Sequence, residues 1–337
     1  MFADSGGHWH EDDVPTRTLL EAGELYLAGG GSHRLLASGP QRAAPTSPPA
    51  AARPVVAFIT HQQPGDAFWD VVRRGAQAAA DADGLELRYE RDDDARREAD
   101  LVRKAAADRV AGIVVSLPDP PTLAPAVRAA VAAGIPVIAV NTGVDAWQAM
   151  GALAYFGQDD AVAGHAVGER LSHERASNTL CVIQMRGHIG LEARCDAAAA
   201  SFTGRLEKMY VDGTDPHAVQ AAIVKKLQQD RSIDRVLTLG AGFALLAQRA
   251  AGDANSYARV VTFDTNPAVI EAISRGTIQW AVDQQPYLQG YLAVDSLWLY
   301  TTNRNVIGGG RPTLTGPSFI DESNVEDVVG HADAGTR

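Results

Sequence analysis

Basic residues are few in this sequence and nowhere form a cluster. The 30 lysines and arginines are outnumbered by 41 acidic residues, so the formal net charge is −11. A nucleic-acid groove needs a basic stripe to neutralise phosphates, and we therefore expect neither DNA nor RNA as a partner. No run reaches the ~20 consecutive apolar residues of a membrane-spanning helix. The acidic amino-terminal residues also lack the basic region and apolar core of a secretory signal, so we recognise no signal peptide.

Cysteines are also scarce. Cys181 and Cys195 are the only two in the chain, and two thiolates cannot build a tetrahedral zinc site alone. They are interpreted either as small buried hydrophobes or as one disulfide between a strand and its following helix, formed in an oxidising compartment. The sequence leaves both interpretations open. We expect no metal and no cofactor.

The usual enzyme motifs are missing. The sequence contains no phosphate-binding G-x-x-x-x-G-K-[ST] loop, no G-x-S-x-G nucleophile turn and no H-E-x-x-H pair. The segment Gly187-His188-Ile189-Gly190 resembles part of a dinucleotide fingerprint but lacks the third glycine, and a tight strand-to-helix turn explains it better. We therefore assign no catalytic residue and expect a protein that is not an enzyme.

Residues 1–52 differ in composition from the rest of the chain. They show no sustained periodicity and end in a Pro- and Ala-rich stretch from Pro45 to Ala52, which is typical of a linker. We interpret residues 1–52 as a disordered or processed leader, or as a wrongly assigned start.

From Pro54 onward, short β-rich runs alternate with longer amphipathic runs. Apolar strands between helices predict parallel sheets covered on both faces. About ten such units exceed one compact sheet, so we expect an α/β fold of two doubly wound parallel-sheet lobes. The expected strands are 55–60, 86–90, 112–117, 135–141, 153–156, 180–185, 208–211, 235–239, 260–263 and 279–282. The expected helices are 68–82, 95–107, 122–133, 161–172, 191–206, 218–229, 243–250, 267–275 and 287–300.

Two expected strands end in the same way. Asn141-Thr142 and Asp264-Thr265 each place a polar side chain and a threonine after an apolar run. Ligands of parallel α/β sheets bind beyond the carboxyl ends of the strands. Asn141 and Asp264 are therefore candidate ligand-binding residues, one from each lobe.

The loop after the first strand contains further candidates. Asp66 is expected either to cap the following helix or to bind a ligand. Phe68 and Trp69 are neighbours on that helix, and adjacent helical residues cannot both face one core, so at least one should face the space above the sheet. An aromatic face above polar groups suits the C–H face of a sugar ring, and we favour a ligand-binding role for all three residues.

Arg194 and Gln284 complete the candidate site. Arg194 lies about one turn into a helix, where it could form a surface ion pair with Glu192 or extend its forked donors into a cleft; we favour the cleft. Gln284 follows the last strand of the second lobe and serves either a helix start or a ligand. Planar donors and acceptors with few cations fit a neutral, polyhydroxylated ligand better than a phosphate or carboxylate.

The order of these residues resembles the ribose/galactose-type (type I) periplasmic sugar-binding proteins of ABC importers, whose fold LacI-type repressor cores share. The resemblance runs from about Pro54 to Phe319. It rests on Pro64-Gly65-Asp66-Ala67-Phe68-Trp69, Gly134-Ile135-Pro136-Val137 before Asn141, Gly157-Gln158-Asp159, Arg194, Phe263-Asp264 and Asp283-Gln284-Gln285-Pro286. Each motif is weak alone, whereas their order and spacing are specific.

The resemblance implies a three-segment hinge, with crossings near Tyr155, Asp283 and Gly316, and closure around the solute. The implied lobes are 53–154 plus 284–315 and 155–283 plus 316–328, followed by a tail, 329–337. It also implies that the seven candidates, Asp66, Phe68, Trp69, Asn141, Arg194, Asp264 and Gln284, bind ligand. One departure is Gly240-Ala241-Gly242-Phe243, where the family commonly has Asn or Asp; an apolar wall from Phe243 is expected instead.

We therefore expect an extracytoplasmic, monomeric receptor that captures a monosaccharide or polyol and delivers it to an ABC permease. A cytoplasmic sugar-responsive regulator with the same core is the nearest alternative, but it requires a basic helix-turn-helix where residues 1–52 are acidic. A sugar-processing α/β enzyme is the third.

Overall fold

The computed structural model describes residues 52–63 and 65–337. It contains two six-stranded sheets, with strand orders β11-β5-β4-β3-β1-β2 and β12-β10-β9-β8-β6-β7. The first comprises β1 (Val55–Thr60), β2 (Glu86–Arg91), β3 (Gly112–Ser116), β4 (Val137–Asn141), β5 (Ala154–Gln158) and β11 (Thr313–Gly316). The second comprises β6 (Asn178–Ile183), β7 (Arg205–Tyr210), β8 (Arg235–Thr238), β9 (Arg259–Phe263), β10 (Ile278–Asp283) and β12 (Ser318–Asp321). The predicted leader, 1–52, lies outside the described residues except for residue 52.

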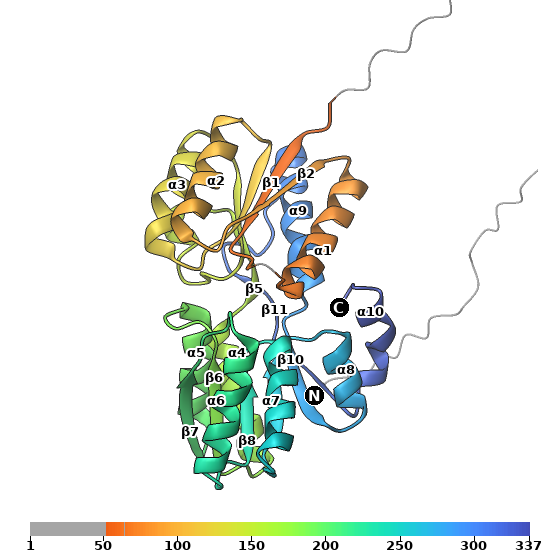
Figure 1. The fold of residues 1–337 in the computed structure, drawn as a ribbon. Helices are drawn as coiled ribbons and strands as arrows, with labels where there is room; N and C mark the ends of the chain where they lie inside the picture. The colour runs from red at the N-terminus through yellow and green to blue at the C-terminus, as the bar shows by residue number, and fades with distance from the viewer. Residues whose placement is uncertain (1–51, 64) are drawn as a thin grey trace, which may run out of the picture. The chain divides into compact units, whose positions relative to one another are not determined.

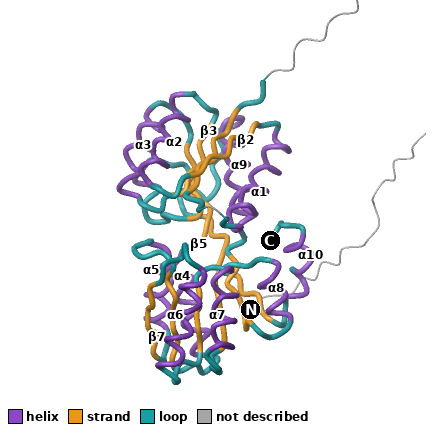
Figure 2. The backbone as a smooth tube through the Cα atoms, viewed as in Figure 1, coloured by secondary structure: helices purple, strands orange, loops and turns teal. Residues whose placement is uncertain are grey.

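Helices cover both faces of each sheet (Figures 1 and 2). On the first sheet, α1 (Ala67–Asp83) and α9 (Pro286–Asn303) pack on one face, and α2 (Ala95–Ala107) and α3 (Pro120–Ala132) pack on the other. On the second, α4 (Asp160–His173) and α5 (Ile189–Ser201) pack opposite α6 (Pro216–Gln229), α7 (Ala241–Asp253) and α8 (Pro267–Ser274). A short α10 (Val329–Asp333) packs near α8. The prediction of two doubly wound lobes is confirmed.

The local sequence explains where these elements form. The central strands are rich in Val and Ile and are buried along almost their whole length, as expected for strands covered on both faces. The edge strands β2 and β7 carry charged residues and are only partly buried, which protects a sheet edge from pairing with other chains. Many helices begin after an aspartate whose side chain accepts backbone N–H groups of the first turn, including Asp94, Asp159 and Asp215.

Several details differ from the predicted elements, among them the strands β11 and β12 and the helix α10, which were not predicted. The second sheet is not wholly parallel, because β12 pairs antiparallel with β10. This short strand enters directly from β11 of the other lobe, without a crossover helix. The helix expected at 191–206 ends at Ser201, and Arg205 and Leu206 already belong to β7. The prediction was too long because the run is rich in alanine, which favours a helix. In the structure the chain bends at Gly204 before β7 begins.

The chain passes between the two sheets after β5, after β10 and between β11 and β12. The first crossing was expected near Tyr155, but all of β5 belongs to the first sheet: Ala154 to Gly157 pair with β4 and Gln158 pairs with β11. The residue boundaries predicted for the lobes otherwise remain predictions. Gln285 Nε2 donates to Thr315 O at 2.7 Å, which links two of the crossing segments. Within the described part of the chain, no helix is both long and apolar enough to cross a membrane.

Candidate functional site

A cavity of about 350 Å³ lies where the carboxyl ends of the two sets of strands face each other. Its volume is at the lower end of the ~300–1,000 Å³ of small-molecule pockets. Its lining includes all seven residues predicted from the sequence: Asp66, Phe68, Trp69, Asn141, Arg194, Asp264 and Gln284. Both lobes contribute, so a molecule held here would contact both.

Asn141 and Asp264 occupy equivalent positions in the two lobes. Asn141 is the last residue of β4 and Asp264 directly follows β9, and both adopt a left-handed backbone, with φ of 68° and 66°. Asn and Asp tolerate this conformation better than other non-glycine residues, which explains these residue types at both strand ends. Asn141 Nδ2 donates to Gln289 Oε1 at 3.2 Å, and Tyr155 OH donates to the Asn141 carbonyl at 2.7 Å. The side chain of Asn141 is thus held in place at the cavity wall.

Asp264 is linked to Gln284. Gln284 Nε2 donates to Asp264 Oδ1 at 2.5 Å, and burial raises the pKa of this carboxyl to about 6 against the opposing effect of Arg194. Gln284 itself is 3% exposed, and its Oε1 has no hydrogen-bond partner among residues 52–63 and 65–337. A buried, unpaired amide oxygen is costly. Gln284 Oε1 can accept a hydrogen bond from a hydroxyl of a ligand in the cavity.

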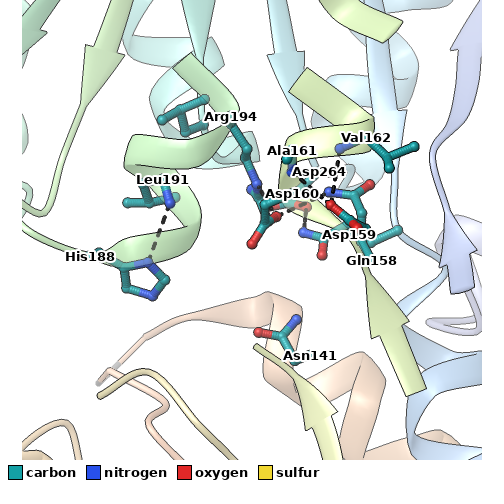
Figure 3. Close-up of polar contacts among 12 residues, drawn as sticks. Asn141, Gln158, Asp159, Asp160, Ala161, Val162, His188, Leu191, Arg194 and Asp264 are labelled. Atoms are coloured by element: carbon teal, nitrogen blue, oxygen red, sulfur yellow. Dashed lines mark hydrogen bonds and ion pairs between the residues drawn. The ribbon is translucent and has the colours of Figure 1, made fainter. Parts of the chain in front are cut away.

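Arg194 pairs with Asp160 rather than with Glu192. Its Nε donates to Asp160 Oδ1 at 2.7 Å, and its guanidinium lies 4.6 Å from the centroid of the Phe263 ring. Figure 3 shows Arg194 extending from α5 towards Asp160 and Asp264, with Asn141 across from them at the end of β4. Glu192 instead accepts from Lys208 and Tyr210. The guanidinium of Arg194 is therefore fixed by contacts with Asp160 and Phe263. Arg194 also lines the cavity.

The first loop combines a capping and a lining role. Asp66 Oδ1 accepts from the Phe68 backbone N–H at 3.1 Å, and burial raises the pKa of Asp66. The rings of Phe68 and Trp69 lie 5.4 Å apart in an edge-to-face arrangement. Trp69 is 3% exposed and Phe68 is half-buried, and both line the cavity. The expectation that at least one of them faces this space is confirmed.

Several lining or supporting residues were not predicted, among them His61, His188 and Asp160. His61 and His188 line the cavity from opposite lobes, with ring centroids 5.6 Å apart, and Asp160 holds Arg194. His61 stands directly after the first strand, a position that strand-end reasoning could have flagged. His188 was assigned to a structural turn, and no single-sequence pattern shows that Asp160 meets Arg194.

Phe243 provides the apolar wall expected from the Gly240–Phe243 departure. Its ring lines the cavity and packs beside Gly213 and Gly240, where an added Cβ would approach it to 3.3 Å and 3.4 Å. At Gly213 an added Cβ would first meet the Gln184 backbone oxygen at 2.8 Å, whereas at Gly240 it would make an ordinary contact with the ring. The second lobe thus presents one apolar surface opposite the aromatic loop of the first.

The two cysteines form a disulfide in the second lobe. Cys181 lies on β6 and Cys195 on α5, next to Arg194 in the chain. Of the two interpretations left open by the sequence, the structure selects the disulfide. It ties α5, which carries Arg194 and follows its N-cap His188, to β6, the strand next to the edge strand β7.

Comparison with known proteins gives a family match over most of the chain. Residues 56–305 match the family described as a periplasmic binding protein domain. A crystal structure of a carbohydrate transporter from Acidothermus cellulolyticus 11B, in complex with myo-inositol, is 52% identical with a TM-score of 0.83. That alignment covers 85% of this chain and 100% of the other.

Two more distant proteins match less of the sequence. An ABC sugar transporter (periplasmic sugar binding protein) from Legionella pneumophila is 25% identical over 78% of this chain and 100% of its own, with a TM-score of 0.71. The xylose/arabinose-binding protein XylF of Sulfolobus acidocaldarius is 24% identical over 65% of this chain. The match spans 58% of that relative's length.

Proposed function

Because the chain belongs to the periplasmic binding protein domain family, we propose that it is the receptor of an ABC importer. It captures a monosaccharide or polyol between its lobes and delivers it to the membrane permease. The observation that carries the proposal is the cavity itself, in which all seven predicted side chains converge from both lobes. Phe68, Trp69 and Phe243 offer apolar surface, and Asn141, Asp264 and Gln284 offer planar hydrogen-bonding groups.

The charges of the site favour a neutral ligand. The guanidinium of Arg194 is neutralised by Asp160 at 2.7 Å, and Asp66 and Asp264 add further carboxyls. An anionic ligand would therefore meet no surplus positive charge. The structural relative from Acidothermus cellulolyticus contains myo-inositol, a neutral cyclic polyol, which makes this compound the first candidate.

The carboxyls of Asp264 and Asp160 are explained by ligand binding alone, without a catalysed reaction. Asp264 is hydrogen-bonded to Gln284, and Asp160 to Arg194, so both carboxyls serve as fixed hydrogen-bond partners. Closure of the lobes around the solute would exclude water. A wrong epimer would direct one hydroxyl elsewhere and leave its protein partner buried and unpaired, at a cost of about 1–3 kcal/mol. Selectivity then follows from hydrogen bonding rather than from turnover.

We also propose that the protein works outside the cytoplasm. Its disulfide supports this, because disulfides form and persist mainly in oxidising compartments. The names of the Legionella and Acidothermus relatives place them in periplasmic or transport systems, which agrees with this location.

A thermal-shift screen of the full chain tests the proposal. The panel contains inositols, pentoses, hexoses and linear polyols, with sugar acids such as glucuronate as the charged control. A ligand that binds only the folded state stabilises it by about 4 kcal/mol at a thousandfold excess over its dissociation constant. We expect a large shift for one or two neutral members, which are recovered unchanged. Absence of any shift, or conversion of the compound, would contradict the proposal.

A further inference from the structure

Glu98 is a buried acid that the proposed binding site does not use. It lies on the inner face of α2 and is 0% exposed. Its Oε1 is 2.8 Å from Ser116 Oγ, whereas its Oε2 is buried without a hydrogen-bond partner in the described part of the chain. Burial raises the pKa of Glu98 well above its usual range. A carboxyl in such a place needs an explanation, because desolvation penalises the ionised form strongly.

Ser116 connects this acid to the cavity. Its hydroxyl accepts from the His61 backbone N–H at 3.0 Å and lies 2.8 Å from His61 Nδ1. Ser116 is 0% exposed and ends β3, so the hydroxyl is fixed between the two groups. His61 lines the cavity, and Ser116 is the only hydrogen-bond partner of its ring among residues 52–63 and 65–337. The second ring nitrogen, Nε2, is thus left for a ligand.

A serine hydroxyl has one proton and two lone pairs. The hydrogen-bonded series Glu98–Ser116–His61 therefore has two complete arrangements. If Glu98 is ionised, Ser116 donates to it and accepts from His61 Nδ1–H, which makes Nε2 an acceptor. If Glu98 is neutral, it donates to Ser116, and Ser116 donates to Nδ1, which places the ring proton on Nε2. The protonation of Glu98 therefore decides what His61 presents to the cavity.

The surroundings favour the neutral acid. No salt bridge reaches Glu98 in the described residues, and Asp92 is the charge that acts on it, with the same sign as its own. An unpaired carbonyl oxygen is also far cheaper to bury than an unpaired carboxylate oxygen. Burial lowers the pKa of the His61 ring to about 3, with a contribution from His188, so the imidazole is neutral at physiological pH.

We propose, on the basis of the function proposed above, that His61 binds the solute as an Nε2–H donor and that Ser116 and Glu98 are positioning residues that fix this tautomer. His61 then supplies a donor from the first lobe, where Asp66 contributes an acceptor. The fixed donor selects for an oxygen of the ligand at one position. Epimers that move this oxygen are rejected.

Other titratable groups lie near the hydrogen-bonded series Glu98–Ser116–His61 and contribute to the pH dependence of the His61 tautomer. His188 faces His61 from α5, Asp66 lies in the loop of His61, and Asp92 acts on Glu98 from the end of β2. Arg194 and Asp160 act on His188. Substitution of Glu98 alone isolates its contribution from theirs.

Nuclear magnetic resonance tests the tautomer without any ligand. In the full chain with ¹⁵N-labelled histidine, long-range ¹H–¹⁵N spectra distinguish Nε2–H from Nδ1–H, and the His61→Gln variant assigns the signal. We expect the Nε2–H form near pH 6.5, moving towards Nδ1–H as Glu98 ionises at higher pH. Glu98→Gln, whose amide also donates to Ser116, should keep Nε2–H at all pH values, and Ser116→Ala should release the preference. The proposal is overturned by an Nδ1–H ring near pH 6.5, by a Glu98→Gln ring that still moves towards Nδ1–H at higher pH, or by an unchanged tautomer preference in Ser116→Ala.

Calorimetry with myo-inositol tests the contact with the ligand. We expect His61→Leu to bind roughly tenfold to a hundredfold more weakly than the wild type, as for loss of one buried hydrogen bond. His61→Gln, which retains a donor near the Nε2 position, should recover part of this loss. Unchanged affinity in a folded His61→Leu variant would overturn the contact and leave the receptor function standing. A wild-type chain that binds no member of the polyol panel would refute the receptor function, while the tautomer is still decided by the spectra.

Discussion

Two carboxyls around the cavity are matched to donors from other elements, whereas Asp66 accepts from the backbone of its own helix, and this matching determines what each side chain can do. Asp160 is matched to Arg194 and Asp264 to Gln284. Because these partners are buried, removal of one leaves the other unsatisfied. Substitutions at this site should therefore affect affinity and stability together, and control variants are needed to separate the two.

Arg194→Ala is expected to weaken binding of myo-inositol by at least about 100-fold, because it removes a ligand donor and leaves Asp160 unpaired. Arg170→Ala is the matched control. Arg170 belongs to the same lobe, pairs with Glu174 and Asp321 and lies over the Trp280 ring, but it does not line the cavity. Calorimetry should show near-normal affinity for the control, and circular dichroism should show that both variants are folded. Equal affinities for the two variants would refute the role of Arg194.

We expect Asp264 to make ligand binding dependent on pH. Burial raises its pKa to about 6, and a ligand hydroxyl donating to it favours the ionised form. Affinity should therefore fall as pH drops below 6, by up to about tenfold per pH unit. The raised pKa also means that Asp264 favours folding below its unfolded pKa of about 4 and loses this contribution as pH rises to about 6. Asp264→Asn should bind more weakly near pH 7 and without this dependence, which titrations between pH 5 and 8 would show. A parallel pH profile in the variant would contradict this account.

At the level of elements, α5 is the helix that places Arg194, and its N-cap His188, at the cavity, while its inner face is bonded to β6. The tie is the bond between Cys181 and Cys195, 14 residues apart in the chain. Gly164 of α4 faces the backbone of Arg194 so closely that an added Cβ would lie 2.4 Å from its carbonyl oxygen. Covalent and steric constraints together fix the helix that presents these two side chains.

Replacing both cysteines, as Cys181→Ala with Cys195→Ala, is expected to lower the free energy of unfolding by about 3 kcal/mol, the value for a loop of this length. Chemical denaturation of the oxidised wild type and the double variant measures this difference. A reductant should lower the stability of the wild type and leave the variant unchanged. Equal stability of the two oxidised proteins would show that the bond does not constrain this lobe.

The sequence allowed much of this architecture and site to be predicted, because strand ends in parallel sheets share one edge. Asn141 and Asp264 could be placed in this way from two similar strand ends. His61, His188 and Asp160 could not, since their roles depend on which loops of two lobes meet. The Glu98–Ser116–His61 chain joins a helix, a strand and a loop across 55 residues of sequence separation between Ser116 and His61, and local patterns carry no such information. Likewise, β12 is too short for its direction to be inferred.

At the level of the whole chain, the three crossing segments should allow the lobes to close around a solute. Both native cysteines are in a disulfide, so Arg128→Cys on α3 and Lys225→Cys on α6, both exposed, provide selective labelling sites in opposite lobes. Spin-label distance measurements should show a narrower distribution when myo-inositol is added. The same labels on the Arg194→Ala background should show no change at that concentration. Identical distributions with and without ligand in the unsubstituted background would contradict closure.

Calorimetric titration of the full chain with myo-inositol, followed by recovery of the compound, tests the central claim most directly. We predict saturable binding of one molecule per chain, no binding of glucuronate under the same conditions, and recovery of myo-inositol unchanged. If myo-inositol and the other neutral sugars and polyols of the panel produce no binding heat, or if the compound returns chemically altered, the account of this protein as a polyol receptor is wrong.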